Sequence, residues 1–160
     1  MMQTPEGRKS FMALQKSDTK IRMMLSDEVV CGSHGGIKEG HVGKTKNGIV
    51  PLIVYLGSVK ERVRNINESA DAIKRGGTIK SVISERIKLL LETQPTENQR
   101  IGQVAGHEAE HILNPKAQTS SYNGIEDKSE EHAIKKEIDL IKQTPFFTGK
   151  IKNDIRKIKL

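Results

Sequence analysis

The sequence of 160 residues contains no tryptophan, two tyrosines and three phenylalanines, so its core must be built mainly from Ile, Leu and Val. The single cysteine, Cys31, excludes an intramolecular disulfide framework and fits a reducing compartment. No apolar run approaches the ~18 residues of a membrane span, and the polar N-terminus lacks the apolar segment of a signal peptide. These absences favour a protein that stays in the cytoplasm or is exported as cargo of a secretion system.

Basic residues exceed acidic ones, 27 to 20, but this excess lies in the flanks. Residues 96–147 hold nine acidic and six basic side chains, whereas residues 148–160 hold five basic and one acidic. A basic excess at the ends is typical of solvated tails. The basic stretch Lys150–Lys159 has no interleaved aromatic residues to stack on bases. The charge pattern therefore argues against nucleic acid as the partner.

The distribution of glycine and of apolar residues predicts three regions. Residues 1–47 are expected to form a flexible leader with one short helix around Lys9–Met24, because residues 31–48 hold six glycines and read as a loop. Residues 48–147 carry the periodic apolar patterns of a folded domain. Residues 148–160 form a basic tail.

Within the central domain the patterns predict one strand and several helices. Ile49–Leu56 is a β-branched run of strand length, and Pro51 moves it towards an edge or an entry position. Apolar spacing predicts helices over Ser58–Lys74 and along 79–91, with a short strand in IKLLLET as the alternative. Further helices are expected from Thr96, which forms a capping box with Gln99, to Leu113, and over Ser129–Lys142, with a polar loop at 116–127 between them.

One motif in this domain has the pattern of a metal site, HExxH at residues 107–111. Two histidines four residues apart lie about 40° apart on a helix, so both imidazoles can reach one metal ion. Glu108 lies beside them on the same apolar face, where it can take a proton from the water that the metal activates. A chance match in a structural helix is the alternative, expected in on the order of one such chain in a hundred.

A stable zinc site needs a third protein ligand after His107 and His111. The metzincin pattern requires a glycine and a histidine where this chain has Asn114 and Ala117, so that class is excluded. The remaining choices are Asp127, Asp139 or a glutamate of the helix Ser129–Lys142.

Among the glutamates of that helix, Glu130 is centred on the apolar face and Glu131 lies at its edge. Glu130 is therefore the predicted ligand, although a glutamate in a first helical turn is also favoured by the helix dipole alone. Glu137 lies about two turns further along and is a candidate for holding a histidine ring from behind.

The sequence HEAEH followed by Glu130-Glu131-His132-Ala133 resembles the minimal gluzincin-type metallopeptidases. The resemblance covers about residues 99–142 and extends to two groups, the metallopeptidase domains of bacterial polymorphic toxins and effectors, and the ImmA/IrrE-like regulatory peptidases. It implies an α+β, mostly helical, zincin-like fold with the HExxH helix central over a small sheet. It also implies Zn²⁺ on His107, His111 and Glu130, Glu108 as the base, and peptide-bond hydrolysis.

A few other residues are weaker candidates. Tyr122, in the loop between the two ligand helices, is a candidate oxyanion stabiliser. Cys31, His34 and His41 are candidates for a second metal site, although such residues are more often plain loop. The expected partners are a protein or peptide substrate and, for a toxin, an immunity or carrier protein. The alternative function is a basic nucleic-acid-binding or regulatory protein in which HEAEH is structural.

Overall fold

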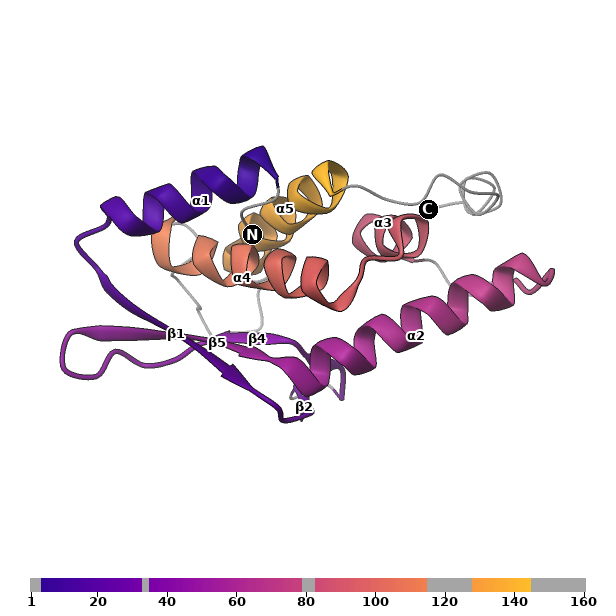
Figure 1. Cartoon of the computed structure of the whole chain (residues 1–160), viewed down its shortest axis with the longest axis horizontal. Coiled ribbons are helices and arrows are strands. Elements are labelled where there is room, and N and C mark those ends of the chain that lie inside the picture. The colour runs from indigo at the N-terminus through magenta and orange to yellow at the C-terminus, as the bar shows by residue number, and fades with distance from the viewer. Residues whose placement is uncertain (1–3, 33–34, 79–82, 115–127, 145–160) are drawn as a thin grey trace.

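The computed structural model describes residues 4–32, 35–78, 83–114 and 128–144. It is an α+β structure rich in helix, as the sequence predicts, with the helices packed over one small sheet (Figure 1). The helices are α1 (Pro5–Lys16), α2 (Leu56–Lys74), α3 (Glu85–Thr93), α4 (Glu97–Leu113) and α5 (Lys128–Gln143). The strands are β1 (Lys20–Ser26), β2 (Val30–Cys31), β3 (Ile37–Lys38), β4 (Gly40–Val42) and β5 (Ile49–Tyr55).

The main sheet has three strands in the order β1-β5-β4. β1 runs parallel to β5 along seven paired residues, and β4 runs antiparallel to β5. β2 and β3 form a separate two-stranded hairpin. Between β1 and β5 the chain therefore forms first this hairpin and then β4, which pairs with β5 on the side opposite to β1.

Pro51 lies in the central strand, so the prediction that it marks an edge is wrong. The residue pairs between β4 and β5 end at Leu52, and the Pro51 carbonyl accepts the last hydrogen bond, from the Gly43 amide. The N–H and C=O of a strand residue point to the same side, so the missing amide proton faces the place where β4 ends. Gly43 and Pro51 therefore share one hydrogen bond where an ordinary antiparallel pair shares two, and the pairing with β4 ends at this residue.

Helix α4 is the centre of the molecule and packs against α1, α2, α5, β4 and β5. Its predicted start is confirmed. Thr96 and Gln99 form a capping box in which each side chain bonds the other residue's backbone amide. The helix ends at Leu113, and the Asn114 amide still donates to the Glu110 carbonyl. His107 and His111, one turn apart on this helix, are therefore held by a well-capped and largely buried element.

The core consists of two clusters of aliphatic side chains. The first joins β5 (Leu52, Val54), α2 (Val59, Val63) and the underside of α4 (Val104, Ala105, Ala109, Ile112). The second joins the far half of α2 to α3 and α5 through Ile66, Ala70, Leu90, Leu91 and Ile141. Each fully buried Leu, Ile or Val contributes roughly 1.5–3 kcal/mol, so α4 and α5 are fixed relative to the sheet by these contacts.

The N-terminal prediction is correct only in part. The helix is capped by Thr4 and ends at Lys16. Residues 20–24, expected at the end of the same helix, belong instead to strand β1. The pairing of β1 with β5 is a contact between residues 29 positions apart, such as Lys20 with Ile49. A helical reading of the local sequence cannot include such a long-range pairing, which here decides the structure.

The prediction of a loop for residues 31–48 is also wrong, because β3 and β4 lie inside this segment. Gly40 is required there by close packing. A Cβ at this position would lie 2.6 Å from Glu108 Oε1 and 2.7 Å from Val104 Cγ1 of α4. The described part of residues 1–47 thus supplies two of the three strands of the sheet instead of preceding the domain.

α2 and α5 lie close to their predicted ranges, whereas the helix expected along 79–91 is α3 and begins only at Glu85. α2 and α5 begin two and one residues earlier than expected. The short strand considered in IKLLLET is wrong, because residues 85–93 form α3, with Ser84 as its cap. The loop 116–127 and the basic tail 148–160 lie outside the described residues. No helix in the described part combines the length and the apolar character needed to cross a bilayer.

Candidate metal centre

Two histidines project from adjacent turns of α4 and turn the same nitrogen atom towards each other. His107 Nε2 and His111 Nε2 are 3.3 Å apart, and the side chains are 10 % and 14 % exposed. The α-helical spacing of four residues explains this convergence, since it brings the two side chains onto one face. The predicted pair is therefore present as a partly buried, two-nitrogen site.

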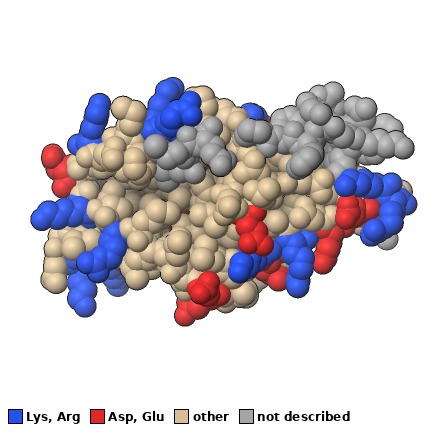
Figure 2. Space-filling view, viewed as in Figure 1, with Lys and Arg blue, Asp and Glu red and all other residues tan. Residues whose placement is uncertain are grey.

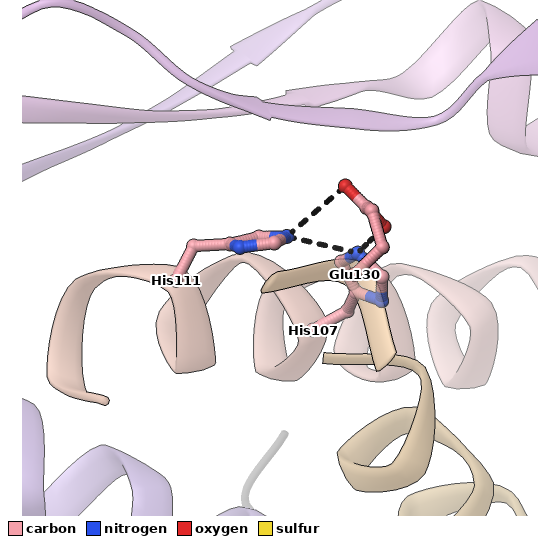
Figure 3. Close-up of side chains that lie close together, drawn as sticks. All are labelled: His107, His111 and Glu130. Carbon is pink, nitrogen blue, oxygen red and sulfur yellow. Dashed lines mark hydrogen bonds and ion pairs between the residues drawn. The ribbon is translucent and has the colours of Figure 1, made fainter. Parts of the chain in front are cut away.

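Helix α5 brings a carboxylate to this pair (Figure 3). Glu130 Oε2 lies 3.4 Å from His107 Nε2, and Glu130 Oε1 lies 3.5 Å from His111 Nε2. Among the described residues, His107, His111 and Glu130 form the group whose donor atoms lie close enough together for a metal ion. The choice of Glu130 over Glu131 as the residue that meets the histidines is thus confirmed in its geometry.

The donor types and separations within this group are compatible with a metal ion such as zinc. Bonds of about 2.0–2.2 Å from zinc to nitrogen or oxygen, arranged as a tetrahedron, place neighbouring donors about 3.3–3.6 Å apart. The two Nε2 atoms are 3.3 Å apart, which lies in that range, and each is 3.4–3.5 Å from a different oxygen of Glu130. With one ligand atom taken from each residue, all three donors lie within 4.8 Å of one another. Two imidazoles and a carboxylate also match the ligand set of catalytic zinc sites, which leave a fourth position open. His107, His111 and Glu130 can therefore hold a metal ion, and their donor types suit Zn²⁺.

The protonation of this group follows from its charges. Burial lowers the pKa of His107, but the carboxylates of Glu130 and Glu137 outweigh burial and raise it to about 9. The same contacts with His107 and His111 hold the pKa of the Glu130 carboxyl well below its ordinary value. In the metal-free protein at neutral pH, a proton therefore occupies the position that a metal cation would take.

Glu108, the candidate base, lies on the buried face of α4 and is 7 % exposed. Burial raises the pKa of its carboxyl, and the neighbouring His107 and His111 rings oppose the rise. Its side chain contacts the backbone of β4 at Gly40, where a side chain would not fit. The group does not belong to the donor triad but lines the same pocket, which is the arrangement expected of a base and not of a ligand.

Glu137 lies behind the His107 ring, the position expected from the sequence for a carboxylate that orients a histidine. Its Oε2 is 3.0 Å from His107 Nδ1, at an angle outside that of a hydrogen bond. A carboxylate facing Nδ1 favours the proton on that nitrogen and so leaves the Nε2 lone pair for a metal.

An arginine that sequence reasoning missed holds this carboxylate. Arg100 is 1 % exposed and donates from Nη1 to Glu137 Oε1 at 2.5 Å and to Gln103 Oε1 at 3.3 Å. The other side of its guanidinium donates to both oxygens of Glu39, from Nε at 2.7 Å and from Nη2 at 2.6 Å. One buried cation thus ties the β3–β4 connection to α4 and α5 directly behind the metal group.

Two outer arginines extend the network. Arg62 of α2 donates to Glu39 Oε2 and to the Ile37 carbonyl, and Arg86 of α3 donates to Glu137 Oε2. Burial raises the pKa of Glu137, yet the charge of Arg100 above all holds it well below its ordinary value. Glu137 is therefore kept ionised and faces His107 as an anion.

A signal for Arg100 and Glu137 is present in the sequence spacing. Arg100 precedes His107 by seven residues, and Glu137 follows Glu130 by seven, so each pair lies two turns apart on one helix face. The helix face that carries the ligands of a metal site also carries the residues that orient them. For Glu39 no such signal exists, because its contact spans 61 positions.

A pocket of about 200 Å³ opens beside the metal group. Its wall combines the metal group's His107 and Glu130 with Glu108 and the start of β4. Lys38 and Arg86 add positive charge to the wall. The pocket thus joins the triad, the candidate base and the edge of the sheet in one space.

The other predicted site residues are not in this group. Tyr122, Asp127 and His34 lie outside the described residues. Cys31 is exposed, and His41 Nδ1 lies 3.2 Å from Lys38 Nζ. Within the described ranges, no group able to hold a second metal ion includes Cys31 or His41.

No protein-family model, curated protein or solved structure matches the chain.

Proposed function

We propose that the protein is a zinc-dependent metallopeptidase that hydrolyses peptide bonds at the pocket beside α4. The observation that carries the proposal is the donor triad, in which two imidazole nitrogens 3.3 Å apart face the carboxylate of Glu130 within 3.5 Å. Two histidines and a glutamate are the ligand set of many catalytic zinc sites. Bound zinc supplies a Lewis acid that polarises a carbonyl and lowers the pKa of water.

Glu108 accepts the proton of the attacking water and passes it to the leaving amine. Its burial supports this role, because a carboxyl with a raised pKa binds a proton more readily than an exposed one. Its place in the pocket wall, outside the donor triad, lets it act on a molecule held there.

The position of β4 supports a peptide as the substrate. β4 is one edge of the three-stranded sheet, and in the described part of the chain no strand pairs with its outer side. Its first residue contacts Glu108. An extended peptide added to such an edge by main-chain hydrogen bonds would pass directly by the base.

Metal content and catalysis are tested together on one preparation. Protein purified without added metal is expected to contain about one zinc per chain and to cleave members of a mixed peptide library, read out by mass spectrometry. Glu108→Gln keeps its zinc and loses the cleavage by roughly 10²–10⁴-fold. Glu110→Gln, on the outer side of the same helix, is the matched control and keeps both.

Absence of zinc, with no uptake on titration, would favour the basic binding protein in which HEAEH is structural. Bound zinc without cleavage of any peptide would support the metal site and contradict the proposal that the protein is a peptidase. Whether the setting is a toxin, an effector or a regulatory peptidase stays a prediction from the sequence resemblance. Toxicity of the wild type on expression, absent in Glu108→Gln, is the observation expected of a toxin.

A further inference from the structure

The exposed apolar side chains of the protein are concentrated in one place. Of the five large apolar residues that are exposed in the described ranges, four lie in β1 or just after it. Met23, Met24, Leu25 and Val29 are 44–60 % exposed. They lie on both faces of the strand, so neither the helices nor the rest of the sheet covers them. Clustered exposed apolar residues of this kind mark an interaction surface.

β1 is also the edge of the sheet opposite to β4. It pairs with β5 along all seven residues, and within the described part of the chain no strand lies on its other side. Proteins usually protect such an edge by shortness, by a bulge, by proline or by an inward charge. Residues 20–26 have neither proline nor an interruption of the pairing with β5. Its charges, Lys20 and Arg22, lie in the first half, so the regular apolar stretch Met23–Leu25 of the edge is left open to a further strand.

The charges around β1 have a defined order. Lys20 and Arg22 lie at its start, Asp27 and Glu28 follow its end, and all four are exposed. Figure 2 shows the same order, with Lys and Arg near the beginning of β1 and an acidic cluster near the turn that leads from β1 to β2. In an antiparallel copy of β1, the basic start of one strand lies beside the acidic end of the other. The two edges are therefore complementary in charge.

We propose that β1 is a homodimer interface, in which it pairs antiparallel with β1 of a second copy about a two-fold axis through Met24. In this register Met23 of one chain lies opposite Leu25 of the other, and Lys20 lies opposite Glu28. Directly opposed side chains share a face, so the apolar centre from Met23 to Leu25 meets itself and each end gains the ion pair of Lys20 with Glu28. Arg22 then lies opposite Ser26, and Asp27 lies opposite Ile21. The contact is isologous, as in most symmetric dimers.

The dimer leaves the metal group accessible. The new contact forms at β1, whereas the pocket lies at β4, the other edge of the sheet. Two three-stranded sheets become one continuous sheet with a pocket at each end. The proposal is independent of the peptidase function, because it depends on the edge strand and not on the metal.

The test is the mass of the intact chain in solution, measured by light scattering across a dilution series. The wild type is expected at twice the chain mass of 17.8 kDa. The variant Lys20→Glu/Arg22→Glu carries four acidic residues along the edge, and Asp27→Lys/Glu28→Lys carries four basic ones. Each is expected as a monomer, because like charges then face each other. An equimolar mixture of the two variants is expected to recover the dimer mass.

Recovery in the mixture also shows that both variants are folded. A matched reversal on α2, Lys60→Glu/Arg64→Glu, alters two exposed cations away from the edge and is expected to stay dimeric. A wild type that remains monomeric at every concentration would overturn the proposal. So would charge variants that stay dimeric alone, or a mixture that stays monomeric.

Discussion

At the scale of single residues, the geometry of the donor triad predicts that two neighbouring glutamates of α5 differ in metal binding. Glu130 lies within 3.5 Å of both histidines, whereas Glu131 is exposed on the next position of α5. Glu130→Gln keeps the shape and removes the negative charge, so zinc retention during dialysis against a chelator is expected to fall clearly. Glu131→Gln is the matched control and is expected to retain zinc like the wild type. Equal losses in both variants would contradict the assignment.

A second prediction at this scale concerns Arg100. Its guanidinium contacts the carboxylates of Glu39 and Glu137 at the same time, which the single ammonium group of a lysine could not do. Arg100→Lys is expected to lower the zinc affinity by about 10–100-fold, the usual effect of losing the contacts behind a ligand. Calorimetric zinc titration measures it. Arg62→Lys changes a partly exposed arginine that contacts only the Glu39 side of the network. It is expected to change the affinity less, and a larger effect at Arg62 would refute the proposed path through Glu137.

The pKa of His107 sets the pH dependence of metal binding. Because this pKa is raised to about 9 in the metal-free protein, zinc must displace a proton from His107 at any lower pH. The apparent zinc affinity is expected to increase by about tenfold per pH unit between pH 6 and 8 from this proton alone, and to level off above pH 9. Affinity that is flat over pH 6–8 would show that His107 is already neutral without metal.

At the scale of elements, the contact between α4 and α5 determines whether the triad forms. Gly106, next to His107, allows this contact, since a Cβ there would lie 2.2 Å from Leu140 Cδ1 of α5. Gly106→Ala is expected to cost about 1–3 kcal/mol of stability through overpacking. It should also weaken zinc binding, because α5 carries Glu130. Gly36→Ala, where a Cβ meets nothing within 4 Å, is the control and is expected to change neither chemical denaturation nor zinc titration.

The elements also show what the sequence could and could not predict. The boundaries of α4 were predictable because a capping box and Asn114-Pro115 mark its ends, and helical periodicity then placed His107, Glu108 and His111 on one face. Glu130 followed from the apolar face of α5. β1 and β4 were missed because their structure depends on pairing with β5, across a glycine-rich stretch that discourages a strand. Arg100 and Glu39 were missed because their ion pair joins distant parts of the chain.

At the scale of the whole molecule, zinc binding is linked to stability. A ligand present at 1,000 times its dissociation constant stabilises the folded state by about 4 kcal/mol, which corresponds to a rise in Tm of roughly 8–16 °C for a chain of this size. The wild type is expected to show such a rise between chelator-treated and zinc-loaded samples in calorimetry. Glu130→Gln is expected to show a much smaller one. A similar rise in both would mean that zinc binds elsewhere.

The buried Arg100 determines the order in which this centre is assembled. Its two carboxylate partners come from the β3–β4 connection and from α5, and leaving either of them unpaired inside the protein costs about 3–5 kcal/mol. The three charges must therefore come together as the chain folds, before any ion arrives, and they orient the His107 ring in advance. Binding of the metal ion then requires no further folding of the chain, so the binding rate is expected to be independent of the folding rate. For the zinc site proposed above, the metal-free chain is therefore expected to be fully folded and able to take up its ion after synthesis.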